Sequence, residues 1–318
     1  MTTFRNPTRR SWIQSAGGSV LLGSLGTTAM ANREAPAWQM GLIADLHYGL
    51  APDALERLDT FMAKVDEVEP DCLLQLGDFN FGVDSEPCMG LWNQFSGPKY
   101  HVLGNHDMDK STKTAMVERW EIPAAYYSFD HKGWHFVILD RNHLKTSPTS
   151  FTDYSKANFY VSSELRGFAN PEQLEWLKED LNSTKLPTVV FSHQGLGMTE
   201  EIDQNSAAGA IEAVLSDANQ RSGLIKACFC GHHHIDRHHI QSGIHYVWIN
   251  SASYYWVGAQ YGRMAPYTSP LFTFLTFHPN ESIEIAASTS KWAEPTPKVR
   301  GFPGWEALNT EIVGRTLD

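Results

Sequence analysis

The feature that most constrains this chain is a set of five short polar clusters, each placed directly after a run of apolar residues. Short apolar runs of this kind are typical of buried β-strands. In an open α/β sheet, residues just beyond the carboxyl ends of neighbouring strands converge on one edge. The sequence therefore predicts one shared site built from all the clusters. They are Asp45-Leu46-His47, Gly77-Asp78, Gly104-Asn105-His106-Asp107, Ser192-His193 and Gly231-His232-His233-His234.

The side chains in these clusters are carboxylates, an amide and imidazoles, and this mixture predicts a metal site. Manganese, iron and zinc suit such mixed ligands, whereas calcium prefers oxygen alone and structural zinc sites are rich in thiolates. Two cations about 3.5–4 Å apart can clamp a phosphoryl group and lower the pKa of a bound water. A carboxylate that bridges both ions offsets their repulsion, and Asp78 is the candidate for that position.

In order and approximate spacing, the clusters resemble the signature of the calcineurin-like metallophosphoesterase superfamily, over Met40 to about Ser251. The resemblance implies an α/β fold, a four-layer αββα sandwich of two mixed β-sheets flanked by helices, with the metal site at the carboxyl ends of the strands. It also implies two divalent or trivalent metal ions, of manganese, iron or zinc. The first would be held by Asp45, His47, Asp78 and His234, and the second by Asp78, Asn105, His193 and His232.

The same resemblance gives His106 a role in catalysis rather than in metal binding. His106 would protonate the leaving oxygen and would be held by Asp107, while a hydroxide that bridges the two metals attacks phosphorus. General acid assistance of this kind typically contributes roughly 10²–10⁴ in rate. Purple acid phosphatases carry a Tyr three residues after the bridging Asp. Phe81 stands at that position here, which argues against that branch.

Segments between Tyr126 and His232 are similar to two narrower groups, the manganese-dependent ADP-ribose/CDP-alcohol diphosphatases and the class III cyclic-nucleotide phosphodiesterases. The first group typically carries Gln where His47 stands. We therefore expect a metal-dependent phosphoric ester hydrolase that cleaves a phosphodiester or phosphoanhydride of a small nucleotide-type molecule. A phosphomonoesterase of the same fold is an alternative. A non-catalytic metal-binding scaffold is a weaker one, because such relatives usually lose ligands and none is missing here.

Two groups outside the clusters are candidates for substrate contacts. Arg141 follows an expected strand at 135–139 and could grip a phosphate with its planar guanidinium, or equally form a surface ion pair. Tyr254-Tyr255-Trp256 could stack on a nucleobase, although packing in the core or in a loop is the commoner use of such a run.

Strand-like and helix-like segments alternate through residues 38–290, which we interpret as one metallophosphoesterase domain. Helices are expected at 52–68, 85–95 and 172–181, the last with Asn170 as its N-cap. Asp140–Phe168 lacks a clear period and is expected to form a long surface loop. Prolines and glycines dominate residues 291–318, which we interpret as a tail wrapped on the surface or partly loose.

Residues 1–31 resemble a twin-arginine signal peptide. Arg9-Arg10 precedes an apolar pair, a weakly hydrophobic run follows, and Ala29-Met30-Ala31 forms a small-x-small cleavage pattern. The run is too short and too polar for a stable membrane span. We therefore expect export of the folded chain by the twin-arginine machinery to the periplasm or another extracytoplasmic compartment.

Charge and cysteine content narrow the partners further. Removing residues 1–31 leaves 22 Lys+Arg of the original 25 against 36 Asp+Glu, a net charge of −14. Such an acidic chain repels nucleic acid polymers, but bound metals could still attract a small phosphorylated substrate. Four cysteines are too few for a disulfide scaffold in a chain of 318 residues, and Cys228 and Cys230 are expected to be buried thiols.

Overall fold

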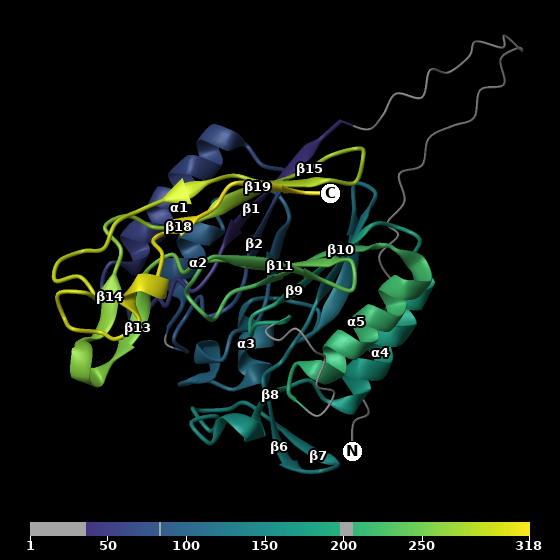
Figure 1. The fold of residues 1–318 in the computed structure, drawn as a ribbon, viewed down its shortest axis with the longest axis horizontal. Helices are drawn as coiled ribbons and strands as arrows, with labels where there is room; N and C mark the ends of the chain where they lie inside the picture. Colours follow the sequence, from purple (N-terminus) through teal and green to yellow (C-terminus); the bar gives the residue numbers. More distant parts are fainter. Residues whose placement is uncertain (1–35, 83, 198–205) are drawn as a thin grey trace, which may run out of the picture. The chain divides into compact units, whose positions relative to one another are not determined.

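The computed structural model describes residues 36–82, 84–197 and 206–318, and Figure 1 shows them as a coloured ribbon. The expected signal peptide at residues 1–31 lies outside these described residues. Residues 36–318 form one compact unit. Among the helices of the described part, none has the length and apolar character needed to cross a bilayer.

A first six-stranded sheet joins strands from both ends of the described chain. Its strand order is β19-β16-β15-β1-β2-β3, with β1, β2 and β3 parallel and the remaining pairs antiparallel. The sheet is therefore mixed, as expected. The bounds are β1 Trp38–Ile43, β2 Cys72–Gln75, β3 Lys99–His101, β15 Thr273–Phe277, β16 Ile283–Ile285 and β19 Arg315–Leu317.

A second six-stranded sheet has the order β11-β12-β10-β9-β5-β4. Strands β12, β10, β9 and β5 are parallel, and antiparallel hairpins close both edges. The bounds are β4 Tyr127–His131, β5 Trp134–Ile138, β9 Thr188–Ser192, β10 Ile225–Cys230, β11 Arg237–Gln241 and β12 Ile244–Trp248.

Three apolar cores define the four layers. The central core lies between the two sheets, where Phe136 of β5 meets Phe277 of β15 with ring centroids 5.5 Å apart. A second core packs helices against the first sheet through Phe61 and Leu73. A third packs helices against the second sheet through Leu177 and neighbours. The predicted αββα sandwich is thus confirmed.

In the described part of the chain, five α-helices supply the outer layers. Figure 1 shows α4 and α5 side by side against the second sheet. Helix α4 begins as predicted, because the Asn170 side chain accepts a hydrogen bond from the backbone N–H of Gln173. The bounds are α1 Ala54–Val68, α2 Glu86–Trp92, α3 Lys113–Arg119, α4 Pro171–Ser183 and α5 Gly209–Ser222.

Two sequence interpretations need correction. The segment expected to be a long loop contains a three-stranded sheet of β6 His143–Ser147, β7 Ser150–Asp153 and β8 Arg166–Phe168. These strands are short and partly exposed, so they carry no hydrophobic period. The expected C-terminal tail contains two strands. Strand β18 pairs with β17, and β19 forms an edge of the first sheet. Both are held in place because Ile312 and Leu317 are buried in the central core. The bounds are β17 Ser288–Thr289 and β18 Glu311–Ile312.

Candidate dinuclear metal centre

Backbone hydrogen bonds beyond the strand ends bring the ligand loops together. The loop after β1 is tied to the loop after β2 by Asp45 N–H donating to Gly77 O (3.1 Å) and His47 N–H donating to Asp78 O (2.8 Å). Across the second sheet, Gly231 N–H donates to His193 O at 3.1 Å. The strand ends of both sheets therefore meet at one edge, as the five clusters predicted.

Asp45, His47 and His234 form the first ligand group. One candidate ligand atom from each lies within 4.8 Å of the others, and all three residues are buried. His234 Nε2 lies 3.2 Å from Asp45 Oδ1. The Asp45 carboxylate also accepts the backbone N–H of His232 at 3.0 Å, which joins the two sheets directly at the site.

Asp78, His193 and His232 form the second ligand group under the same 4.8 Å limit. Asp78 Oδ2 lies 3.0 Å from His193 Nε2 and 3.5 Å from His47 Nε2. Asp78 therefore faces ligands of both groups with one carboxylate. This placement fits a carboxylate that bridges two ions.

Backbone carbonyls orient two of the imidazoles. His193 Nδ1 lies 2.8 Å from Leu76 O, and His234 Nδ1 lies 2.5 Å from Tyr254 O. A carbonyl only accepts, so each Nδ1 carries a hydrogen, and each Nε2 is the ring nitrogen that faces a carboxylate. This arrangement is common among metal-binding histidines.

Unpaired buried atoms show that the site fits cations. Both ring nitrogens of His47 and the Oδ1 atom of Asn105 are buried without a hydrogen-bond partner in the described structure. Buried polar atoms are rarely left unpaired in proteins. Asn105 lies beside the second group, since the next residue, His106, donates its backbone N–H to Asp78 Oδ1 at 2.7 Å. Asn105 is thus placed to act as the seventh candidate ligand.

Two imidazoles and the shared carboxylate have charges that suit ligation at neutral pH. Burial lowers the pKa of His47 to about 3 and holds the pKa of His232 well below its ordinary value, so both rings are neutral. Burial alone would raise the pKa of Asp78, but the nearby His193 and His106 outweigh it and hold that pKa well below the ordinary range. Asp78 is therefore ionised.

The predicted partner of His106 is wrong. The Asp107 carboxylate instead accepts backbone N–H groups from Gly104 (2.7 Å), Asn80 (2.9 Å) and Asp78 (3.1 Å), so it ties the loop after β2 to the loop after β3. The His106 ring is held by Asp109, with Nδ1 2.5 Å from Oδ2.

The local backbone geometry explains why Asp109, and not Asp107, contacts the His106 ring. Residues His106–Met108 form a 3₁₀ turn, in which side chains three apart eclipse. Asp109 therefore stands beside the His106 ring, while Asp107 is fully buried beneath it. The i,i+3 spacing of His106 and Asp109 is the sequence signal that could have identified the pair.

Among the residues that the structure describes, Arg141 contacts backbone carbonyls rather than a surface acid. Its guanidinium is buried and donates to the carbonyl oxygens of Gly167 (2.9 Å), Gln194 (3.2 Å) and Gly195 (2.5 Å). Both sequence interpretations of Arg141 are corrected by these contacts. Its role is to hold the loop that follows the ligand His193.

Aromatic rings surround His106. Phe81 is stacked on it at 5.3 Å between centroids, and Phe159, Trp256 and Tyr160 lie at 5.9, 6.0 and 6.2 Å. Tyr160 is 60% exposed. Sequence analysis does not identify Tyr160, because this residue lies in the segment Asp140–Phe168, which has no clear hydrophobic period.

Within the run Tyr254-Tyr255-Trp256, one ring packs in the core and another lies at the edge of the metal centre. Tyr254 is buried against the His47 ring at 5.0 Å, as core packing predicts. Trp256 is only partly buried and lies 6.1 Å from His47.

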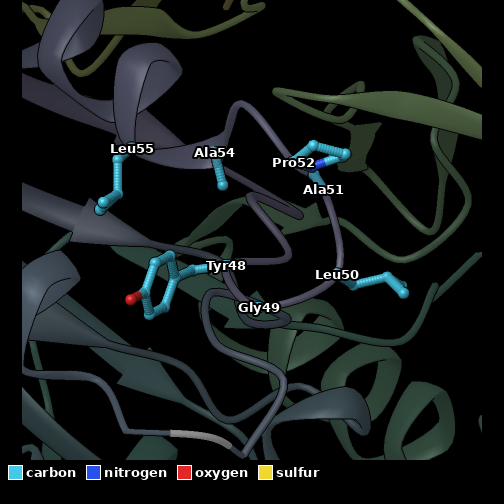
Figure 2. Close-up of a pocket in the computed structure, with 7 residues that line it drawn as sticks. All are labelled: Tyr48, Gly49, Leu50, Ala51, Pro52, Ala54 and Leu55. Carbon is cyan, nitrogen blue, oxygen red and sulfur yellow. The ribbon is translucent and has the colours of Figure 1, made fainter.

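A pocket of about 290 Å³ lies on the loop that follows His47, and Figure 2 shows the side chains that line it. Its lining is Tyr48, Gly49, Leu50, Ala51, Pro52, Ala54 and Leu55. The seven metal-ligand candidates are not part of this lining.

Comparisons with known proteins agree with this geometry. The chain is 24% identical to a manganese-dependent ADP-ribose/CDP-alcohol diphosphatase from Oryza sativa subsp. japonica, over 70% of this chain and 85% of that protein. Among solved structures it is similar to a dimetal phosphatase from Danio rerio, with a TM-score of 0.58, 16% identity, and coverage of 79% of this chain and 96% of that one.

A second similar structure is the GAP50 anchor of the Plasmodium inner membrane complex, with a TM-score of 0.54, 12% identity and 89% of each chain covered. At such identities these structures bear on the fold alone. The sequence profile described as calcineurin-like phosphoesterase matches residues 40–236, which is more than half of the chain. The expectation of a hydrolase is thereby confirmed, and the chain belongs to the calcineurin-like phosphoesterase family.

Proposed function

We propose that this chain hydrolyses a phosphodiester or phosphoanhydride bond of a small nucleotide-type molecule at a dinuclear metal centre. The observation that carries the proposal is the position of Asp78, whose carboxylate faces His47 of one ligand group and His193 of the other. His106 lies directly beside this carboxylate. Two metal positions and an adjacent proton donor together suit phosphoryl transfer to water.

The seven candidate ligands would hold two metals in the arrangement that the family resemblance implies. Asp45, His47, Asp78 and His234 would bind one ion, and Asp78, Asn105, His193 and His232 the other. When bound, the ions would polarise the phosphoryl oxygens and lower the pKa of a coordinated water.

His106 is the candidate general acid. Asp109 engages its Nδ1 atom, which leaves Nε2 as the nitrogen available to substrate. Burial lowers the pKa of His106, but Asp78 and Asp109 outweigh this effect and raise the pKa above its ordinary value. The raised pKa favours the protonated ring, which is the form that can deliver a proton to the leaving oxygen.

The substrate class is supported by the aromatic surroundings and by the Oryza sativa relative, whose name describes a diphosphatase. Phosphomonoesters are the competing class. A panel of ADP-ribose, CDP-choline, cyclic AMP, bis(p-nitrophenyl) phosphate and p-nitrophenyl phosphate, assayed with manganese-loaded protein, separates them. Turnover restricted to p-nitrophenyl phosphate contradicts the proposed class.

The His106→Ala variant tests the mechanism. It should bind the same amount of manganese as the wild type, because His106 is outside the proposed ligand set, and kcat should fall roughly 10²–10⁴-fold. Metal content is measured by mass spectrometry and turnover on the best substrate of the panel. Unchanged turnover rejects His106 as the acid.

We further propose export through the twin-arginine pathway, on the basis of Arg9-Arg10 and Ala29-Met30-Ala31. Replacing both arginines by lysine should leave the protein in the cytoplasmic fraction. Cell fractionation with an activity assay measures this, and unchanged export of the variant contradicts the proposal.

A further inference from the structure

A hairpin beyond the five clusters reaches the metal centre. It consists of β13 Tyr254–Gly258 and β14 Arg263–Pro266, joined by a short 3₁₀ turn at Ala259–Tyr261. The hairpin is anchored to the site, because the carbonyl of Tyr254 accepts the Nδ1–H of the ligand His234. Trp256 lies two residues further along and shares that face of the strand. Its ring is 6.0 Å from His106 and 6.1 Å from His47.

Arg263 lies over the ring of Trp256. The guanidinium carbon is 5.5 Å from the ring centroid, and the side chain is exposed. Within the described part of the chain, no carboxylate pairs with this guanidinium and no acceptor takes its hydrogens. The chain has 36 acidic against 25 basic residues, so acidic partners for an arginine are plentiful, yet none pairs with Arg263 in the described part of the chain. Its five N–H donors remain available to a ligand.

The backbone at Arg263 is held in an unfavourable conformation. Its φ angle is +65°, directly after Gly262 at +86°. For a long L side chain the left-handed region costs roughly 1–2 kcal/mol, and such strain often marks functional positions. The hairpin therefore places an arginine where glycine or asparagine would be favoured on stability alone.

The charge of Arg263 reaches the same space as His106. Burial raises the pKa of Tyr160, and Asp109 raises it further, but Arg263 acts in the opposite direction. The same opposing effect of Arg263 is present at Tyr254. The hydroxyl of Tyr160 lies 3.4 Å from His106 Nδ1. The guanidinium, placed over Trp256, is therefore separated from His106 by one aromatic ring.

We propose that Arg263 is a specificity-determining residue that binds the second, unreacted phosphate of a diphosphate substrate. This inference rests on the proposed function and narrows its substrate class to phosphoanhydrides. One phosphate of such a substrate would lie at the metal centre, and its neighbour would meet the guanidinium fork, which suits two phosphate oxygens at once. A cyclic nucleotide or a diester with neutral arms offers no second anion to Arg263.

Three variants test the role of Arg263. Arg263→Asn removes the charge with a residue that suits the left-handed backbone, so it should fold at least as stably as the wild type. Arg263→Lys keeps the charge without the fork. Lys298→Gln is the matched control, because Lys298 is also an exposed cation over a tryptophan, 4.6 Å from the Trp305 ring centre, in the C-terminal segment.

Binding is measured first, by calorimetry on manganese-loaded protein. Wild-type protein should bind α,β-methylene ADP more tightly than AMP. Arg263→Asn should weaken binding of α,β-methylene ADP by about tenfold or more and binding of AMP by less than about twofold. Arg263→Lys should fall between, and Lys298→Gln should match the wild type. Equal losses for both ligands, or no preference in the wild type, overturn the inference.

Turnover separates this inference from the proposed function. For ADP-ribose, Arg263→Asn should raise KM by about tenfold with a smaller change in kcat, while hydrolysis of bis(p-nitrophenyl) phosphate stays within about twofold. If the wild type hydrolyses ADP-ribose and Arg263→Asn does so equally well, the inference is overturned and the proposed function is not. A wild-type protein that shows the binding preference but hydrolyses none of the panel overturns the proposed function and leaves only the binding of a second phosphate by Arg263.

Discussion

At the residue scale, the two aspartates around His106 have separate tasks. Asp107 fixes the backbone under the ligands through three N–H groups, whereas Asp109 contacts the imidazole. In the proposed function, Asp107 would support metal binding and Asp109 would support proton transfer. Substitutions at the two positions should therefore fail in different ways.

Replacing Asp109 by alanine should impair the acid. Asp109 helps to raise the pKa of His106, so its loss lowers that pKa and the ring deprotonates at a lower pH. Since a general acid works in its protonated form, the alkaline limb of the kcat profile should move to lower pH, with normal manganese content. Rates measured between pH 5 and 10 check this shift. An alkaline limb that stays in place rejects the role of Asp109.

Replacing Asp107 by alanine should impair the metal site. Three buried N–H groups lose their acceptor, at a cost of about 1–3 kcal/mol for each group left unpaired. We expect a lower free energy of unfolding in urea and reduced manganese content by mass spectrometry. Asp109→Ala serves as the control with full metal content. Wild-type stability of Asp107→Ala would show that the three contacts are unimportant.

At the element scale, strand β5 and helix α4 are joined by an ionic triad. His135 Nδ1 lies 2.6 Å from Asp130 Oδ1, and His135 Nε2 lies 2.7 Å from Asp180 Oδ2. Burial lowers the pKa of His135, but Asp180 and Asp130 outweigh it, so the folded-state pKa is raised above the ordinary value of 6.5. The protonated ring therefore stabilises the packing of α4 on the second sheet.

The contribution of His135 to stability should depend on pH. Because the folded-state pKa is raised, the stabilisation is fully present below the unfolded pKa near 6.5 and is lost as pH rises through the folded-state pKa. His135→Gln should therefore lower the free energy of unfolding by roughly 1–3 kcal/mol at pH 6 and by less at pH 9. Urea titrations at both pH values measure the difference in free energy of unfolding between the wild type and the variant. A larger difference at pH 9 than at pH 6 contradicts the prediction.

At the scale of the whole molecule, the site joins parts of the chain that lie far apart in sequence. The C-terminal segment is one of these, since Asn309 exchanges two hydrogen bonds of 3.0 Å with the backbone of Asp236, just after the ligand loop of the second sheet. Arg315 also pairs with the Asp236 carboxylate. Metal binding should therefore stabilise the fold as a unit.

Manganese should raise the melting temperature of metal-free protein. The ligands assemble only in the folded state, so binding adds RT ln(1 + [L]/Kd), about 2.7 kcal/mol at 100 times Kd. Thermal unfolding after chelator treatment, with and without manganese, measures the shift. His193→Ala, which removes a ligand of the second group, should show a smaller shift. An equal melting temperature with and without manganese contradicts the assembled site.

The sequence by itself determined most strands of the two main sheets and the candidate ligands. Each ligand follows a buried apolar run, and the carboxyl ends of parallel strands share one edge whatever the details of packing. Only the tertiary structure decided that Asp109 holds His106, that Arg141 faces carbonyls, that residues 311–317 join the folded core, and that Arg263 stands over Trp256. These outcomes depend on side-chain direction and on contacts between distant segments, which a local hydrophobic period does not encode.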